Sequence, residues 1–172
     1  GYEGITYAAD HGAHIINCSW GGAGGGSFGQ DIVDYATINK NALVIAAAGN
    51  DGQDLAYFPA SYTYVLSVAA TNSTSDGKAT FSNYNYTVDL SAPGNQIDAT
   101  IYNNNYTAQS GTSMAAPIVA GAAGLVKSKF PNYTGLQIAE RLKQTTDNNY
   151  RSFDAVTNPN ITNPAATASS LQ

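Results

Sequence analysis

A run of small residues near the middle of the chain constrains the fold more than any other feature. Residues 111–124 read GTSMAAPIVAGAAG, which predicts a helix with no polar side chain after its first turn. A helix that is apolar all round is buried, so we expect this one to be covered on every side, with other backbones approaching closely. Each glycine inside it costs about 1 kcal/mol relative to alanine. Because the glycines make the helix less stable, they indicate that the residues at its start are positioned for a specific role.

The start of this helix presents a serine beside unpaired backbone donors. Thr112 is expected to cap the helix, which leaves Ser113 in the first turn, near free N–H groups and the positive end of the helix dipole. Pro117 has no N–H, so the carbonyl of Ser113 loses its usual intrahelical partner. The pattern is typical either of a core helix that begins with serine or of a serine positioned for chemistry.

Apolar runs alternate with helical patterns along the rest of the chain. The patterns predict strands at 15–18, 43–47, 65–69 and 88–90, helices at 2–12, 28–40 and 134–143, and a hairpin over 96–110. Continuous apolar strands between helices indicate an α/β fold with a parallel sheet covered on both faces. At 172 residues and 43% hydrophobic composition, the chain is long enough for one domain with a sizeable core.

The composition argues against several classes of binding partner and binding site. Charged residues make up 11% of the chain, the formal net charge is −5, and lysine and arginine do not cluster. This balance argues against a nucleic acid or an anionic membrane as partner. The single cysteine, Cys18, excludes an internal disulfide and a cysteine-based metal site. No run approaches the length of a membrane span.

Residues 111–117 resemble the nucleophile motif of subtilisin-like serine peptidases, Gly-Thr-Ser-Met-Ala-(Ala or Ser)-Pro. Ile118 stands where many members have histidine, at a position that is not catalytic in the family. The resemblance implies that Ser113 is the nucleophile of a serine endopeptidase that forms an acyl-enzyme. It also implies the three-layer subtilisin-like sandwich, of which this chain would hold the C-terminal half of the parallel sheet.

A second motif ends the apolar run at 43–47. An amide side chain at the carboxyl end of a buried parallel strand lies at the edge where α/β sheets place their sites. A Gly-Asn pair after a strand is by itself most often a turn, but here it resembles the oxyanion-hole segment of the same family. The resemblance implies that Asn50 donates to a developing oxyanion together with the Ser113 N–H. The small residues before it suggest an open, apolar pocket. The residues that we expect to bind substrate here are Ala47, Ala48, Gly49 and Thr112.

Residues 12–22 carry a third match, similar to the family's Gly-Ala-x-Val-Ile-Asn-x-Ser-x-Gly-Gly. In the family this backbone pairs with an extended substrate as an added strand. The resemblance implies that Ser19, Trp20 and Gly21 hold substrate, with Trp20 as an apolar wall. The other interpretation of Trp20 is an ordinary, partly buried aromatic residue beside a glycine loop.

The residues that would activate the serine do not match the family's motifs. A serine nucleophile needs a base and a carboxylate that orients the base. His11 and His14 lie outside a His-Gly-Thr-His context, and no aspartate ends a strand as Asp-(Ser/Thr)-Gly. A Cys18–His14 dyad is disfavoured, because their positions on one strand do not bring the two side chains together. We therefore expect residues 1–145 to be the C-terminal part of a subtilisin-like domain, with the triad aspartate and histidine upstream of Gly1 and this chain alone inactive.

Two functions remain open at this point: a serine endopeptidase, and a non-catalytic peptide-binding or pseudo-protease module that retains the cleft. The expected partners are a protein or peptide substrate and the upstream half of the same domain, with no nucleic acid and no membrane. The resemblance implies an extracellular or cell-envelope location and requires no cofactor. Calcium sites are frequent in the family, but no loop matches one residue by residue, and no metal ligand is assigned. Residues 146–172 are interpreted as a polar tail, for which loose packing is one reading.

Overall fold

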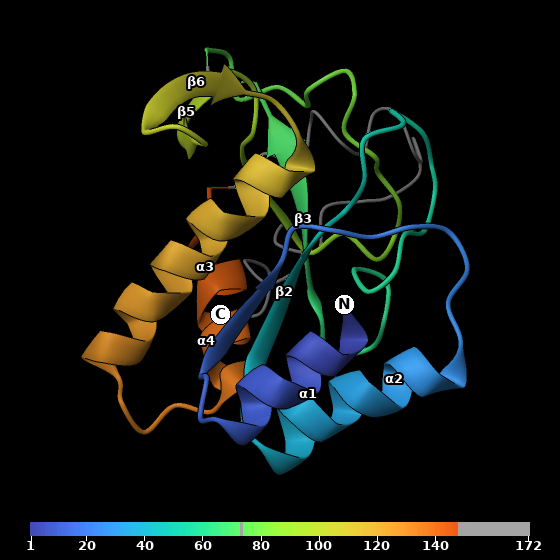
Figure 1. Cartoon of the computed structure of the whole chain (residues 1–172), viewed down its shortest axis with the longest axis vertical. Helices are drawn as coiled ribbons and strands as arrows, with labels where there is room; N and C mark the ends of the chain where they lie inside the picture. The colour runs from blue at the N-terminus through green and yellow to red at the C-terminus, as the bar shows by residue number, and fades with distance from the viewer. Residues whose placement is uncertain (73, 148–172) are drawn as a thin grey trace, which may run out of the picture.

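Parallel strands form the central layer of the fold (Figure 1). The computed structural model describes residues 1–72 and 74–147, and within them four strands make one sheet: β1 (Ile15–Cys18), β2 (Leu43–Ala47), β3 (Leu66–Thr71) and β4 (Leu90–Pro93). They lie in the order β1-β2-β3-β4, and each neighbouring pair is parallel. The expected parallel sheet is therefore confirmed.

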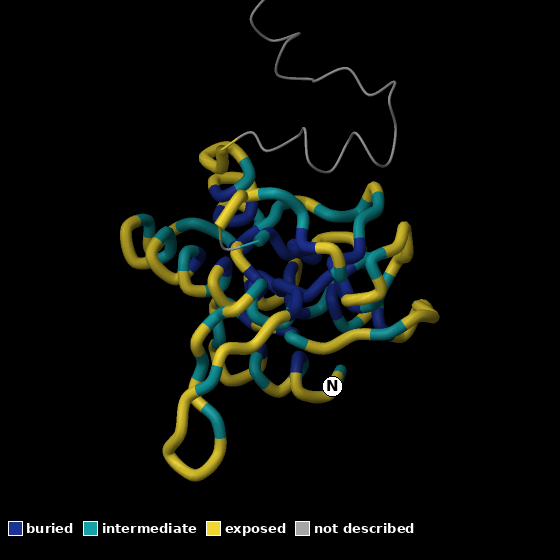
Figure 2. Tube along the Cα trace, turned by 90° about the horizontal axis from the view of Figure 1, so that it is seen from above, coloured by how far each residue is buried: buried dark blue, intermediate teal, exposed yellow. Residues whose placement is uncertain are grey.

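Helices cover both faces of this sheet. On one face lie α1 (Tyr2–Asp10) and α2 (Ser27–Asp34), which continues into the π-helical turn η1 (Tyr35–Asn39). On the other lie α3 (Thr112–Lys129) and α4 (Gly135–Thr145). Successive side chains of a strand point to opposite faces, so β2 contributes side chains to the hydrophobic cores on both faces of the sheet. Val44 and Ala46 pack with the α1–α2 side, whereas Leu43, Ile45 and Ala47 pack with the α3–α4 side. Figure 2 shows these buried segments gathered at the centre of the molecule.

Several elements differ from the predicted bounds. The strand expected at 88–90 runs from Leu90 to Pro93, because its partners on β3 extend to Thr71. Proline is tolerated there, since β4 is an edge strand of the described sheet and Pro93 ends it. The helix expected at 28–40 changes to a π-helical turn at Tyr35. The hairpin is confirmed as β5 (Ile97–Ile101) and β6 (Asn105–Gln109), which pair antiparallel.

The long helix α3 is not buried on every side, and that expectation is wrong for the described residues. Ala115, Ala116 and Val119 are buried against the sheet. The opposite face leaves Ile118 at 42% and Leu125 at 74% exposure. An all-round apolar pattern marks every face as suited to burial, but it does not say which faces have a partner within the chain.

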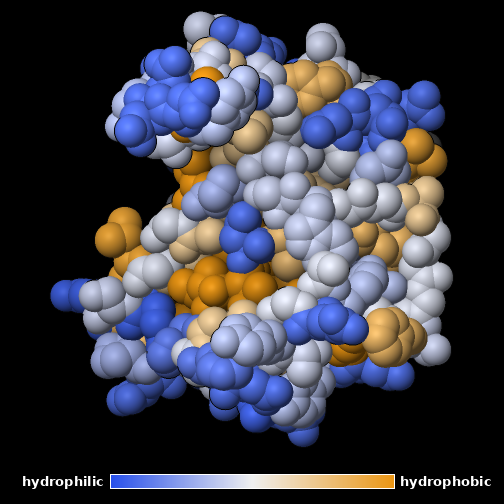
Figure 3. Space-filling model, viewed as in Figure 1, coloured by the Kyte–Doolittle hydropathy of each residue, from blue (hydrophilic) through white to orange (hydrophobic). Residues whose placement is uncertain are grey.

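Strand β1 forms the other edge of the described sheet. Figure 3 shows apolar atoms exposed between α3 and α1, over the region where Figure 1 places β1. An edge strand presents unpaired backbone N–H and C=O groups to any further strand. Within residues 1–72 and 74–147, no helix is long and apolar enough to cross a membrane. Most of the predicted polar tail, 148–172, lies outside the described residues.

Candidate active site

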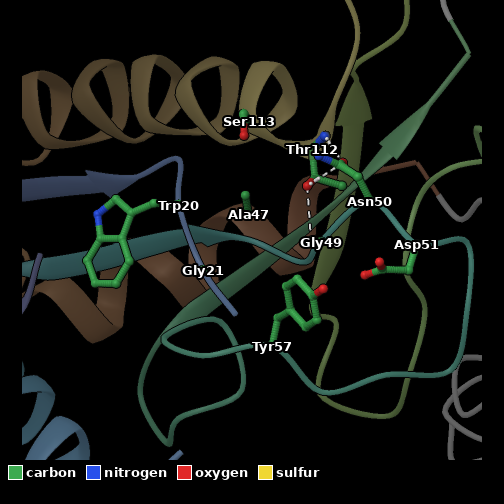
Figure 4. A pocket seen from close by; sticks show the side chains of 9 residues that line it. All are labelled: Trp20, Gly21, Ala47, Gly49, Asn50, Asp51, Tyr57, Thr112 and Ser113. Carbon is green, nitrogen blue, oxygen red and sulfur yellow. Dashed lines mark hydrogen bonds between the residues drawn. The ribbon is translucent and has the colours of Figure 1, made fainter. Parts of the chain in front are cut away.

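The predicted site residues meet around one cavity, at the carboxyl ends of β1 and β2 and the start of α3 (Figure 4). The cavity has a volume of about 340 Å³. It is lined by Trp20, Gly21, Ala47, Gly49, Asn50, Asp51, Tyr57, Thr112 and Ser113. The structure therefore brings together all the predicted catalytic and substrate-binding residues except Ser19 and Ala48.

Ser113 and Ser19 are held together by two reciprocal hydrogen bonds. The Ser113 hydroxyl donates to the Ser19 carbonyl oxygen at 3.1 Å, and the Ser19 hydroxyl donates to the Ser113 carbonyl oxygen at 2.9 Å. That second carbonyl is the one that Pro117 leaves without its helical partner. Ser19 thus satisfies the acceptor freed by the proline, and it holds the segment after β1 against the start of α3.

Thr112 does not cap α3 as expected. Gly111 is the N-cap, and Thr112 is the first residue of the helix, with its side chain fully buried. Its hydroxyl accepts from the Gly49 N–H at 3.1 Å and donates to Asn50 Oδ1 at 3.0 Å. A threonine at the capping position would accept from the free N–H groups of its own helix, whereas here the loop after β2 offers the hydroxyl one donor and one acceptor. Thr112 therefore joins β2 to α3.

The side chain of Asn50 is oriented by Thr112. Asn50 Oδ1 accepts from the Thr112 N–H at 2.8 Å as well as from the Thr112 hydroxyl. Because both bonds use the oxygen, the amide NH₂ of Asn50 remains the donor end. Gly49 precedes it with φ +108, a backbone conformation that favours glycine. A Cβ there would also lie 2.3 Å from Asn83 Nδ2 and 2.7 Å from the Tyr57 ring, so no larger residue fits.

Trp20 and Gly21 form the opposite side of the cavity. The Trp20 ring is 37% exposed and packs edge-on against Tyr2, with 5.3 Å between ring centroids. Gly21 is followed by Gly22, which exchanges two backbone hydrogen bonds with Phe58 at 2.9 and 3.1 Å. Ala48 does not line the cavity. It is buried beneath it, and its carbonyl accepts from the Asn83 amide at 3.3 Å.

Asp51 and Tyr57 are cavity residues that the sequence patterns did not identify. The Asp51 N–H donates to Asn83 Oδ1 at 2.8 Å, and Asn83 Nδ2 donates to Asp51 Oδ2 at 3.3 Å. A hydrogen bond to the Asp51 carboxylate raises the pKa of the Tyr57 phenol, and burial and the negative charge of Asp51 act in the same direction. The position of Asp51 directly after Asn50 was an available signal, but no spacing connects Tyr57 with Ser113.

Neither histidine lies at the cavity. His11 follows α1, where its ring stacks on Tyr7 with 3.9 Å between centroids. His14 precedes β1, and its carbonyl accepts from the Leu43 N–H at the start of β2. Both are therefore at the amino ends of the strands, opposite to Ser113. Cys18 is buried, and burial raises the pKa of its thiol to about 11, so it is not an activated nucleophile.

Acidic, histidine and cysteine side chains do not gather into a metal-binding group of three or more anywhere in residues 1–72 and 74–147.

The sequence profile of the subtilase family, peptidase S8, matches residues 2–163. This chain belongs to the subtilase family. Thermitase from Thermoactinomyces vulgaris is 44% identical to it over 145 residues, which are 84% of this chain and 50% of thermitase. The thermostable alkaline protease of Halalkalibacterium halodurans is 43% identical over 143 residues, which are 83% of this chain and 39% of that protein.

Other subtilases show the same partial coverage. The cell wall-associated protease of Bacillus subtilis is 46% identical over 153 residues, which cover 89% of this chain and 17% of that protein. A protease structure from Pseudoalteromonas arctica superposes with a TM-score of 0.81 at 31% identity, and it covers 86% of this chain and 51% of that one. The chain thus spans half or less of the length of these curated relatives, and its fold is the subtilisin-like α/β fold.

Proposed function

We propose that this chain supplies the nucleophile and the oxyanion donors of a subtilisin-type serine endopeptidase. The observation that carries the proposal is the shared cavity of Ser113 and Asn50, which lie far apart in the sequence. In this reaction Ser113 Oγ attacks a peptide carbonyl and loses its proton to a base. The amine leaves with a proton, and water then releases the acyl group from the serine.

The negative charge of the tetrahedral intermediate needs donors that are already in place. The Ser113 N–H lies in the first turn of α3, where backbone donors have no helical partner. The amide NH₂ of Asn50 is the second donor, because Thr112 occupies the oxygen of that side chain. Substrate would pair with the backbone of residues 19–21, with Trp20 as a wall.

The base and its orienting carboxylate come, in this proposal, from a part of the protein outside this chain. Both histidines of the chain lie at the other end of the sheet, and the Ser113 hydroxyl donates to a carbonyl rather than to a base. The free edge of β1 and the exposed face of α3 suit an upstream half of the same domain as partner. The relative described as cell wall-associated favours an extracellular or cell-envelope location.

A fluorophosphonate probe, which labels only an activated serine, tests the proposal. The 172-residue chain should label little above background, and the chain extended by its natural upstream sequence should label at Ser113, with Ser113→Ala as the control. Rapid labelling of the chain alone would show that a base lies within it. An unlabelled extended protein would contradict the peptidase and support the alternative, a peptide-binding module without catalysis.

In the extended enzyme, Asn50→Ala and Asn50→Asp separate the donor role from a structural one. Asn50→Asp keeps an oxygen for the Thr112 N–H but removes the amide donor. Both variants should lose about 10²- to 10³-fold in kcat, the magnitude known for such a donor in subtilisin, with a much smaller change in KM. An Asn50→Asp enzyme with normal kcat, or a loss confined to KM, would mean that Asn50 only shapes the turn.

A further inference from the structure

We propose that Asn83 is a positioning residue for the oxyanion donor, because it holds the backbone on both sides of Asn50. The inference rests on the proposed function, since it concerns a donor of that same site. The Asn83 side chain is fully buried and does not line the cavity. A buried amide is costly unless its hydrogen bonds are made, so the partners of Asn83 indicate which segment it holds.

The turn that carries Asn50 depends on other segments for its shape. Residues 48–53 follow β2, and their backbone-to-backbone hydrogen bonds are made with groups outside the turn. The Ala48 N–H donates to a carbonyl of β3 at 3.0 Å, and the Gly52 N–H donates to the Phe81 carbonyl at 2.7 Å. The position of Asn50 is therefore set by the segments that surround this turn.

Asn83 bonds to the turn on either side of Asn50. The Asn83 N–H donates to the Gly49 carbonyl at 3.0 Å, and Asn83 Oδ1 accepts from the Asp51 N–H at 2.8 Å. These two groups belong to the planar peptide units that flank the Cα of Asn50. Asn83 Nδ2 adds a bond to the Ala48 carbonyl at 3.3 Å. One residue thus fixes both peptide units between which Asn50 stands.

The oxyanion donor is held from two different parts of the fold. Asn83 lies in the segment between β3 and β4 and fixes the backbone of Asn50, whereas Thr112 on α3 directs its amide (Figure 4). An oxyanion donor must already lie within hydrogen-bond distance of the place where the charge forms. Because about 1 Å of misplacement can cost on the order of 10²-fold in rate, loss of Asn83 should impair catalysis without any direct contact with substrate.

Amide hydrogen exchange in the 172-residue chain tests this coupling without any need for hydrolysis. The reporter amides are those of Asp51, which bonds to Asn83 directly, and Thr112, which bonds to Asn50 Oδ1 and not to Asn83. In Asn83→Ala, both reporter amides should exchange about tenfold faster relative to the amides of β2, which report global unfolding. The Thr112 amide is the decisive one, because Asn83 can affect it only by moving the turn.

Asn85→Ala is the matched control. Asn85 lies in the same segment, where its Nδ2 donates to the Leu55 carbonyl at 2.7 Å and its Oδ1 accepts from the Thr87 N–H at 2.7 Å. Neither partner belongs to residues 48–53, so this variant should leave both reporter amides at wild-type protection relative to β2. If circular dichroism shows that Asn83→Ala is unfolded, Asn83→Ser takes its place, because it leaves a smaller cavity, and the reporter amides should again exchange faster.

In the extended enzyme, a double-mutant cycle shows whether Asn83 acts through the donor. Asn83→Ala should lower kcat by about 10- to 100-fold with a much smaller change in KM, because a misplaced donor weakens binding of the transition state alone. In the Asn50→Ala background, the same substitution should change kcat by less than about twofold, since no donor remains to be misplaced. Asn85→Ala should keep kcat near the wild-type value.

The outcomes separate this inference from the proposed peptidase. A Thr112 amide that stays at wild-type protection in Asn83→Ala, or that Asn85→Ala accelerates equally, would overturn the role of Asn83, whatever the probe labelling shows. An Asn83→Ala loss of kcat that is equally large in the Asn50→Ala background would overturn it as well. If the extended protein fails to label, the peptidase proposal is lost, and the exchange experiment by itself decides whether Asn83 positions Asn50.

Discussion

The hydroxyl of Thr112 joins two segments that are far apart in the sequence, so its removal tests the architecture of the site directly. Thr112→Val replaces the hydroxyl with a methyl group of similar size. The Gly49 N–H then loses its acceptor at 3.1 Å, and Asn50 Oδ1 loses one of its two donors. Because Thr112 and Gly49 are both buried, water cannot replace the lost acceptor of the Gly49 N–H.

The expected loss of stability follows from these two bonds. A buried donor without a partner costs about 1–3 kcal/mol, and the bond to Asn50 contributes about 1 kcal/mol. Thr112→Val should therefore lower the free energy of unfolding by about 2–4 kcal/mol, or the melting temperature by roughly 5–15 °C for a chain of this length. Thr112→Ser is the matched control, since it keeps the hydroxyl and loses one methyl group, at a cost of about 1 kcal/mol.

Urea unfolding of the three proteins, followed by far-UV circular dichroism, measures the difference. The expected order of stability is wild type, then Thr112→Ser, then Thr112→Val. A valine variant as stable as the serine variant would show that the hydroxyl does not connect β2 to α3, and the argument for the orientation of Asn50 would fail with it.

Two further predictions concern the packing around the sheet. Burial raises the pKa of the Asp89 carboxyl despite its bonds to the Ser67 N–H and Lys143, so its protonated form favours the folded state. The free energy of unfolding of the wild type should therefore rise relative to that of Asp89→Asn as the pH falls from the raised pKa towards the unfolded value near 3.8. Urea unfolding at several acidic pH values measures this difference, and a fall of the wild type relative to the variant would refute the prediction. Gly135→Ala should destabilise the chain by about 1–3 kcal/mol, because the new Cβ would lie 2.8 Å from the Leu43 backbone nitrogen. Gly121→Ala should instead stabilise the chain by about 0.5–1 kcal/mol, because the new Cβ on α3 meets open space. A lower melting temperature for Gly121→Ala than for Gly135→Ala would contradict the packing of α4 on β2.

Local patterns in the sequence were enough to predict the order of the elements, whereas the roles of Ser113 and Asn50 were inferred from their resemblance to the motifs of the family. Buried parallel strands need continuous apolar runs, so 15–18 and 43–47 were identified as strands and lie where expected. Asn50 follows one of these strands, which placed it at the carboxyl edge of the sheet, and the structure puts Ser113, in the first turn of α3, at the same cavity. Pro117 likewise indicated that the Ser113 carbonyl would lack its helical partner.

The identity of each polar partner was decided only by the tertiary structure. The acceptor freed by Pro117 is satisfied by Ser19, and the hydroxyl of Thr112 is used by the loop after β2 instead of by its own helix. Asp51 and Tyr57 enter the cavity because Asn83 and the loop around Phe58 hold them there. A sequence pattern records which groups need burial or a partner within one element. Which group from a distant segment meets that need depends on how the elements pack, and no local spacing encodes it.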